Sequence, residues 1–403
     1  MGYIFKKGTC YYRLMSLVEA SAIVKKAVVI FGVTLGLYIF FLLIKNPLRE
    51  LYLAVFPPDD LPDYAYGLLD PLEFTKVNVL TPYPEFTLFT KDGSLPNDLP
   101  NKMPVYKYKE PRYSFSEGEK AQKDALALGF DDTMRLSDLS AERFKWQDLT
   151  FGGNLEIDTN TRAIELDTPM SNIGNFYPTG KFTQTEAIER AKEILIQIGR
   201  FSDKLYTLDV RGTQRVTYGK FDEIRVEEAD SALEAQLAKV DFFRRIFDYP
   251  ILGPDPEQGL LNVTLRAPEV DDGNPQLNYP ELNAYHWEID TEENATYPLI
   301  PIGVAWGQIV EGNGVISNVT STEATPFEKN KPVRVDDIII NEVFLAYFDN
   351  DRPQKFLQPI YVFKGHFTAN TAGGKGSITV YYPAIGSEYI KGPQNQPVQS
   401  GQL

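Results

Sequence analysis

The chain has almost no cysteine, histidine or tryptophan, and it has no surplus of positive charge. Among 403 residues there is one cysteine, Cys10, so no disulfide can form within the chain. Only two histidines occur, whereas a zinc site usually needs three or four converging ligands. The formal net charge of −15 argues against nucleic acid, which is normally bound by a basic stripe. We therefore expect no nucleic-acid partner, no metal and no cofactor.

Motifs for nucleophilic and phosphate chemistry are also missing. No serine lies in a G-x-S-x-G elbow, which disfavours a catalytic triad built on His286 or His366. The stretch "NTAGGKGSITV" looks like a phosphate-binding loop, but Gly376 follows Lys375 where a P-loop has Ser or Thr, and a strand pattern follows. We interpret this stretch as a hairpin turn, and we predict no catalytic or cofactor-binding residue.

Acidic turns leave questions that the sequence does not answer. "EVDDGN" at residues 269–274 and "DNDRP" at residues 349–353 offer oxygen ligands of the kind that calcium accepts. Neither fits the twelve-residue EF-hand loop, so solvated turns are the simpler interpretation. Cation binding at Asp271–Asp272 or at Asp349–Asp351 stays open. A pair of catalytic carboxylates is also an alternative, because a sequence does not give the distance between two acids.

One long uncharged run lies near the N-terminus, at residues 27–44. As a helix its 18 residues extend about 27 Å, enough to cross the hydrocarbon core of a bilayer. A cleaved signal peptide is the alternative, but its apolar region would be about 7–15 residues long and would precede an A-x-A-like site. Five basic residues precede the run and two follow it closely, so the positive-inside rule places residues 1–26 in the cytoplasm.

This predicted anchor makes the lipid bilayer a partner through residues 27–44. The first 45 residues hold six basic residues and one acid, so the remainder carries a net charge of about −20. We expect a single-pass protein of the cell membrane with a cytoplasmic N-terminus and an acidic extracytoplasmic body.

Residues 45–112 form a separate zone with eleven prolines. Proline fixes φ and removes an amide donor, so long helices are excluded there. The aromatic stretches "YAYGLLDPLEF" and "YPEFTLF" favour an extended arm with a few short strands that lies against the body. A disordered spacer is the alternative.

Three later stretches predict helices, each ended by a glycine. "SFSEGEKAQKDALALGF" begins with Ser116 and Glu119, which form a capping-box pattern. "TQTEAIERAKEILIQIG" begins with the same pattern at Thr183 and Glu186 and continues with an apolar stripe. "YPLIPIGVAWGQIVEGNG" places Pro301 at a first-turn position, although its glycines weaken it.

Alternating apolar and polar residues after each helix predict strands. After the first helix comes "RFKWQDLTFGGNLEIDTNTRAIELDT", in which Leu155 and Ile157, and then Ile164 and Leu166 beyond a turn at "DTNTR", alternate with polar neighbours. After the second helix, "KLYTLDV" is expected to pair with "QRVTYG". "LNAYHWEID" is also expected to be a strand, with Tyr285, Trp287 and Ile289 on one face.

The predicted fold class is α+β: one N-terminal transmembrane helix followed by tandem helix-on-antiparallel-sheet units. The first unit, residues 113–180, is a helix plus a hairpin. Residues 181–295 and 296–390 each form a helix-plus-sheet unit. Residues 391–403 lack large apolar residues apart from Val398 and Leu403 and are expected to be a disordered tail.

The stretch "FLAYFDNDRPQKFLQPIYVFKGHF", residues 344–367, has two interpretations. Apolar and aromatic residues have the spacing of two strands around the loop "DNDRPQK", which indicates a core hairpin. The alternative is a free aromatic edge strand that pairs with a partner strand.

Several of these pieces, in order, resemble a known arrangement. They are the anchor, the "PPDDLPDYAYGLLDPLEF" arm, "SEGEKAQKDALALGF", "TEAIERAKEIL", "VDFFRRIFDYPI", "YPLIPIGVAWGQIVEGNGVI" and "LQPIYVFKG". The order resembles uncharacterised membrane-anchored bacterial proteins with tandem PepSY-like units, and it is more distantly similar to YycH/YycI-type extracytoplasmic regulators. The resemblance covers most of residues 50–390. It implies a helix-over-sheet unit that binds or restrains another protein, and it brings no catalytic residues.

These observations predict a non-catalytic binding or regulatory module of the bacterial cell envelope. Its expected partner is another envelope or membrane protein. The alternatives are a structural cell-surface component and an envelope hydrolase that uses carboxylates. A deep pocket with converging carboxylates or with His286 would favour the hydrolase.

Overall fold

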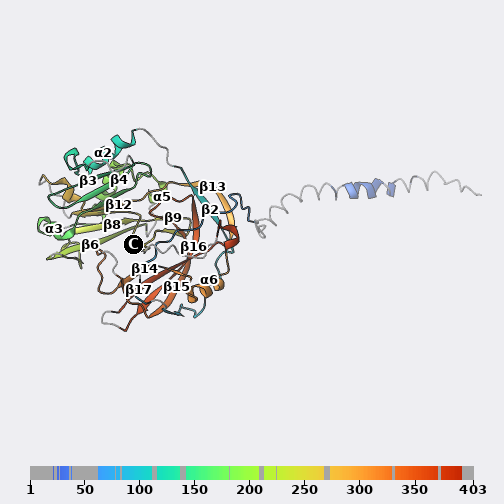
Figure 1. Ribbon diagram of the computed structural model, residues 1–403. Coiled ribbons are helices and arrows are strands. Elements are labelled where there is room, and N and C mark those ends of the chain that lie inside the picture. The colour runs from blue at the N-terminus through green and yellow to red at the C-terminus, as the bar shows by residue number, and fades with distance from the viewer. Residues whose placement is uncertain are drawn as a thin grey trace, which may run out of the picture. The chain divides into compact units, whose positions relative to one another are not determined.

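The computed structural model describes residues 62–392, except 78, 82–83, 111–115, 137–141, 181, 208–212, 224, 267–272, 329–331 and 371–373, and some residues between 21 and 38 (Figure 1). The chain divides into two compact units, Met1–Leu61 and Pro62–Leu403. In the first unit, residues 28–35 are helical. Among the described residues no helix is long and apolar enough to cross a membrane, but residues 27, 36–37 and 39–44 of the predicted span lie outside the described residues.

The second unit, called the body below, is α+β and contains two large sheets (Figure 1). The first is an eight-stranded, fully antiparallel sheet in the order β3-β4-β5-β12-β11-β8-β6-β7. Its strands are β3 (Arg143–Gln147), β4 (Asn154–Asp158), β5 (Ile164–Asp167), β6 (Gln214–Asp222), β7 (Arg225–Glu228), β8 (Leu237–Phe242), β11 (Leu261–Arg266) and β12 (Glu281–Ala284). Because β5 pairs with β12, residues 113–180 and 181–295 share one sheet.

The second sheet is nine-stranded and mixed. Its main path is β13-β2-β16-β15-β10-β9, with β1 beside β15, β17 beside β16 and β14 beside β17. Its strands are β1 (Glu85–Leu88), β2 (Lys102–Tyr108), β9 (Arg244–Ile246), β10 (Tyr249–Leu252), β13 (Ile289–Pro298), β14 (Val315–Ser321), β15 (Asp337–Phe348), β16 (Phe356–Thr368) and β17 (Lys375–Pro383). The proline-rich zone therefore supplies β1 and β2 to this sheet.

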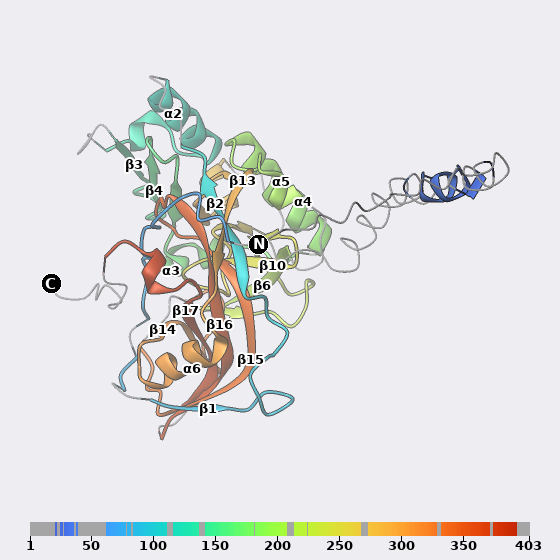
Figure 2. The same cartoon turned by 90° about the vertical axis from the view of Figure 1, so that its right-hand side faces the viewer.

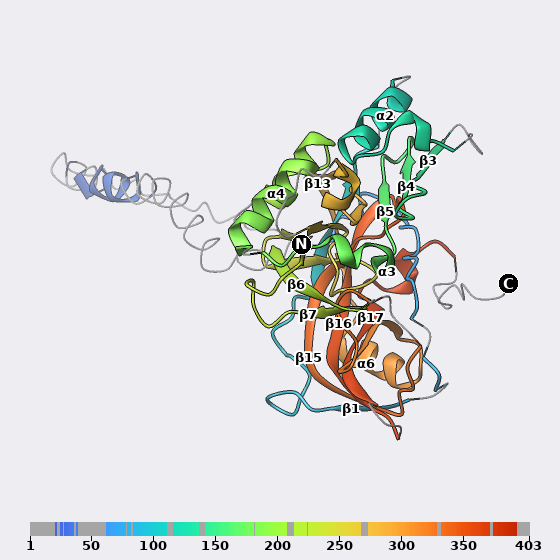
Figure 3. The same cartoon turned by 90° about the vertical axis from the view of Figure 1, so that its left-hand side faces the viewer.

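Helices α2 (Glu117–Ala127) and α4 (Gln184–Gln197) cover one face of the eight-stranded sheet (Figures 2 and 3). The capping box of Thr183 and Glu186 is confirmed, since both reciprocal hydrogen bonds are present. The box of Ser116 and Glu119 was a wrong prediction, because α2 begins at Glu117 without a side-chain cap hydrogen bond. Glu117 instead forms an ion pair with Lys120, one turn later.

Helix α6 (Ile302–Val310) is the third predicted helix and packs on the nine-stranded sheet. The shorter helices are α3 (Met170–Ile173) and α5 (Lys204–Thr207), with 3₁₀ turns at Asp132–Met134, Gly174–Phe176, Pro275–Asn278 and Ser387–Tyr389. The predicted strand "KLYTLDV" is thus wrong in its first half, where the Asp203 carboxylate accepts a hydrogen bond from the Leu205 amide and starts a helical turn.

The continuous strand predicted over "LNAYHWEID" is also wrong. Strand β12 ends at Ala284 and β13 begins at Ile289. Between them the Trp287 indole donates to the carbonyl of Asn350 at 2.8 Å, and the Trp287 carbonyl accepts from Arg244 at 2.8 Å. These contacts replace the ladder hydrogen bonds that a continuous strand would need.

The hairpin at residues 344–367 lies in the core. Strand β15 pairs with β16 on one side and with β1 and β10 on the other. Strand β16 pairs with β15 on one side and with β2 and β17 on the other. Neither is a free edge, so the core interpretation is confirmed and the edge-pairing alternative is wrong.

Candidate functional site

A cleft of about 1390 Å³ opens between the two sheets. One wall is the face of the eight-stranded sheet that is turned away from α2 and α4. The other wall consists of residues from β14, β16 and β17. Two loops complete the cleft: residues 253–260, which join β10 to β11, and residues 322–328, which follow β14.

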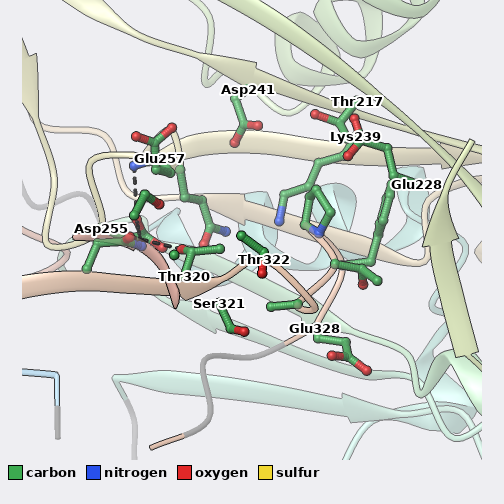
Figure 4. Close-up of a pocket in the computed structure, with 18 of the residues that line it drawn as sticks. Thr217, Glu228, Lys239, Asp241, Asp255, Glu257, Thr320, Ser321, Thr322 and Glu328 are labelled. Carbon is green, nitrogen blue, oxygen red and sulfur yellow. Dashed lines mark hydrogen bonds between the residues drawn. The ribbon is translucent and has the colours of Figure 1, made fainter. Parts of the chain in front are cut away.

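The eight-stranded sheet supplies a polar wall because polar and apolar residues alternate along its strands. On β8, Ala238 and Val240 pack under the helices, whereas Lys239 and Asp241 face the cleft (Figure 4). Only 7% of Lys239 and 1% of Asp241 is exposed. A polar face this deeply buried costs free energy unless hydrogen bonds or ion pairs compensate.

Glu257 connects the two walls. Its carboxylate accepts hydrogen bonds from Arg215 of β6 at 3.0 Å and from Lys364 of β16 at 2.7 Å. Arg215 also lies 3.4 Å from Asp241. Burial alone would raise the pKa of Glu257, but Lys364 and Arg215 outweigh it, so the pKa is lowered and the carboxylate stays charged.

Asp255, two residues earlier in the same loop, has only neutral donors. Its Oδ1 atom accepts from the side-chain amide of Asn318 at 2.8 Å and from the backbone amide of Glu257 at 2.9 Å (Figure 4). No lysine or arginine of the described residues lies within 4 Å of its carboxylate. Burial raises the pKa of Asp255, although the hydrogen bond from the Glu257 amide works against this rise.

Asp241 has an intermediate environment. Burial raises its pKa, while the charges of Lys239 and Arg215 partly offset that effect. Its Oδ1 atom accepts from the amide of Gly259 at 3.0 Å, which ties the 253–260 loop to β8. The loop is therefore held by carboxylate contacts on both of its sides.

The 322–328 loop is attached to the eight-stranded sheet at the other side of the cleft. The Thr325 hydroxyl donates to the Val226 carbonyl at 2.9 Å, and Arg225 pairs with Glu328 at 3.0 Å. The Phe327 ring rests on Gly219, where an added Cβ would lie 2.8 Å from the ring. The loop is thus a packed wall of the cleft.

The lining is hydroxyl-rich and has more acids than bases. Thr217, Thr320, Ser321 and Thr322 present hydroxyl groups (Figure 4). The basic members are Arg215, Lys239, Lys364 and Lys375, and the acidic members are Asp167, Glu228, Asp241, Asp255, Glu257, Glu281 and Glu328. Counting one charge for each, the cleft has a formal excess of three negative charges.

The two histidines lie in different places. His366 of β16 lines the cleft and is exposed. His286 lies outside the cleft, with its ring 5.5 Å from that of Tyr206, and its Nδ1 atom has no hydrogen-bond partner among the described residues. Of the two observations expected of a hydrolase, the pocket with carboxylates is present, but His286 is not part of it.

Asp349 belongs to a second polar group, which we call the Arg244 cluster: Arg244, Asp203, Asp349, Tyr108 and the Trp287 carbonyl. Arg244 donates to Asp203 at 2.9 Å and also to Asp349, and the Tyr108 hydroxyl donates to Asp349 at 2.7 Å. Arg244 is 2% exposed and Asp349 1%. Asp349 is therefore committed to Arg244 and is no open cation ligand.

The described residues contain no group of three or more His, Cys, Asp or Glu side chains placed to hold a metal ion. Asp271–Asp272, the other acidic turn, lies outside the described residues. Lys375 and Gly376 of "NTAGGKGSITV" begin β17 and line the cleft, and residues 371–373 of this stretch are not described.

Sequence reasoning missed the main polar residues of the cleft. Asp255 and Glu257 lie in "GPDPEQG", which reads as an ordinary turn, and Lys239 and Asp241 alternate on β8 like residues of a solvated face. The alternation was a usable signal for a polar face. Nothing local shows that a second sheet, built partly from residues 315–383, covers it.

Comparisons with known proteins add little. No family model and no curated protein matches the chain. One solved structure, the crystal structure of an uncharacterized protein from Eubacterium rectale ATCC 33656, is similar with a TM-score of 0.39 and 11% sequence identity. The alignment covers 71% of this chain and 85% of that chain. Similarity at this level supports no conclusion about function.

Proposed function

We propose that the body is a binding module rather than an enzyme, and that its cleft holds an extended segment of a partner protein. The observation that carries this proposal is a buried polar face that opens onto a cleft of about 1390 Å³. Small-molecule sites usually measure about 300–1,000 Å³, so this cleft suits a chain-like ligand better. Hydroxyls, amides and charged groups on both walls suit the polar groups of a polypeptide.

A membrane setting is part of the same proposal. We propose that residues 27–44 anchor the chain in the cell membrane, with residues 1–26 in the cytoplasm and the body outside. The uncharged run and the basic bias before it support this orientation. The partner would be another envelope or membrane protein, as the resemblance to PepSY-like and YycH/YycI-type proteins implies.

The finer architecture is a proposal too. We propose that a helix followed by strands occurs three times behind the anchor, with the first two repeats sharing the eight-stranded sheet. The order of α2, α4 and α6, each followed by strands, supports it.

Digestion of intact cells by an added protease tests the membrane orientation. The body should be cut, and a body that stays intact until the cells are lysed would contradict the proposed orientation.

Site-specific photo-crosslinking in native membranes tests the binding function. A photoreactive residue replaces Thr322, which is exposed and lines the cleft, or Glu193, which is exposed on α4 at the opposite face of the eight-stranded sheet. We expect a discrete adduct with one other protein from position 322 and none from position 193.

Each other result has a defined meaning. The same adducts from both positions, or none from position 322, would contradict binding in the cleft. Adducts only with other copies of this chain would favour the structural cell-surface component.

A carboxylate hydrolase is the second candidate. The observation that favours it is that Asp241 and Asp255 share the cleft and that burial raises the pKa of both, as for many catalytic acids. Release of reducing ends from purified cell-wall glycan by the wild-type protein, with loss of that release in Asp255→Asn, would establish it. No release by the wild type would leave binding as the function, and equal release by the two proteins would exclude Asp255 as the catalytic acid.

A further inference from the structure

The charge of the cleft limits what binds there. Its lining has seven acidic and four basic side chains, and the chain as a whole carries −15. Two of the four basic groups, Arg215 and Lys364, are already engaged by Glu257. An anionic ligand would therefore meet net repulsion, whereas a cationic one would be attracted and steered toward the cleft.

Asp255 is the carboxylate best placed for a ligand cation. Two neutral donors hold its Oδ1 atom, and no described residue donates to Oδ2. Asn318 comes from β14 and Glu257 from the 253–260 loop, so the carboxylate is fixed from both sides. A fixed, partly desolvated carboxylate without a cation is a strong acceptor for an incoming ammonium or guanidinium group.

Lys239 is a hydrogen-bond donor and therefore requires an acceptor on the ligand. Its side chain is buried, and its ammonium group forms an ion pair with Glu281 Oε1 at 3.6 Å but donates a hydrogen bond to no described residue. An ammonium group carries three donors, so Lys239 can still donate to a ligand that enters the cleft. Because acids surround it, a neutral acceptor such as a backbone carbonyl fits this position better than a second anion.

We infer that the ligand of the cleft is an extended polypeptide segment with a lysine or arginine side chain that binds Asp255, while a backbone carbonyl of the same segment accepts a hydrogen bond from Lys239. This inference rests on the proposed function and specifies its ligand. Asp255 lies in the 253–260 loop and Lys239 on β8, at separate positions of the cleft lining, so one extended segment can contact both (Figure 4).

Selection from a randomised twelve-residue peptide display library on the full-length protein tests the inference. Parallel selections use wild type, Asp255→Asn and the control Glu193→Gln on α4. We expect lysine and arginine to be enriched at one position of the peptides from wild type and from the control. That enrichment should disappear with Asp255→Asn.

A double-mutant cycle then assigns the contact. The best peptide and its lysine-to-glutamine variant are titrated against wild type and Asp255→Asn. We expect each single change to weaken binding about tenfold, the size of one charge-assisted contact, and the double change to add little more. If Asp255→Asn proves unstable, Glu228→Gln takes its place. Glu228 is exposed in the same cleft, and its neutralisation should weaken binding two- to threefold.

The outcomes separate this inference from the proposed function. Neutral or acidic peptides that block crosslinking from position 322 would overturn the inference and preserve a peptide-binding cleft. Additive effects in the cycle would overturn the assignment to Asp255. If no peptide is enriched on the wild-type protein, or if it binds only a neutral glycan oligosaccharide, both the inference and the proposed function are contradicted.

Discussion

The body contains two polar groups between its sheets, and they differ in how complete they are. In the Arg244 cluster, the guanidinium donates to two carboxylates and one carbonyl, and the Tyr108 hydroxyl donates to one of these carboxylates. The charged side chains of the cluster are less than a tenth exposed. In the cleft, Glu257 holds Arg215 and Lys364, whose side chains are 40% and 41% exposed. Asp255 has no ion-pair partner among the described residues, and the charge of Lys239 acts on it only from a distance.

The difference indicates two roles. In the Arg244 cluster the charged groups already bind one another, so they are not available to a ligand. Their contacts fix Asp203, β9 and the end of β15 relative to one another. Among the described residues, the cleft keeps the Asp255 carboxylate without an ion pair and the Lys239 ammonium group with only a 3.6 Å ion pair to Glu281, whereas a purely structural network would have satisfied both more fully. We therefore assign the Arg244 cluster to stability and the cleft to binding, and the following variants test that division.

The largest effect is expected from Arg244→Met. Removing the guanidinium leaves Asp203 and Asp349 buried without their counter-charge, which typically costs about 3–5 kcal/mol. Urea unfolding followed by tryptophan fluorescence measures the loss, and Trp287 lies in the cluster as a probe. The matched control is Arg334→Met, whose ion pair with Asp336 is half exposed and should contribute less than about 1 kcal/mol. Equal losses in the two variants would mean that the cluster is not a stability element.

A pH effect of intermediate size is expected from His286, which lies beside the cluster. Burial, together with the charge of Arg244, lowers the pKa of His286 to about 3. The unfolded chain binds the proton near its ordinary pKa of about 6.5 and the folded chain does not, so stability falls as the pH drops below that value. Between pH 7 and pH 5 the loss amounts to at most about 2 kcal/mol.

The variant His286→Phe should remove this pH dependence. The control His366→Phe, at an exposed position, should leave it unchanged. The measurement is the free energy of unfolding at several pH values. An unchanged slope in His286→Phe would show that His286 takes up its proton at the same pH in the folded and the unfolded protein.

The fold was predictable where local signals are strong and agree with each other. Thr183, Glu186 and the apolar stripe behind them determine α4 without tertiary help, and the alternation around Leu155 and Ile157 determines β4. Residues 204–207 and 285–288 were mispredicted because Asp203 and Arg244, distant or non-periodic partners, decide their backbone. Such tertiary contacts leave no periodic trace in the sequence.

The cleft was less predictable than the fold. Its walls come from strands more than 100 residues apart, such as Lys239 on β8 and Lys364 on β16. Alternation on β8 predicts a polar face and nothing about what covers it. A cleft between sheets depends on sheet packing, for which the sequence offers no short-range pattern.

A smaller effect, of opposite sign, is expected from Asp255→Asn. At pH 7 the wild-type carboxylate is ionised in a buried site that raises its pKa, so neutralising it should stabilise the protein by up to about 1 kcal/mol. The gain should shrink as the pH falls and vanish below the ordinary aspartate pKa of about 3.9, where the carboxyl is protonated in the folded and the unfolded chain alike. Asp336→Asn is the control, because the Asn370 amide helps to lower the pKa of Asp336 and its neutralisation should destabilise. Destabilisation by Asp255→Asn at pH 7 would place Asp255 among the structural residues.

The smallest change in stability is expected from Glu257→Gln. Its partners are about two-fifths exposed, so the lost ion pairs should cost less than about 1 kcal/mol. The 253–260 loop should nevertheless loosen, because Glu257 is its only described ion-pair link to both Arg215 and Lys364. Hydrogen exchange should then quicken at the amides of Glu257 and Gly259, which donate to Asp255 and Asp241. A loss of stability as large as that of Arg244→Met, with unchanged exchange, would erase the distinction between the two polar groups, because the cleft network would then be as structural as the closed cluster.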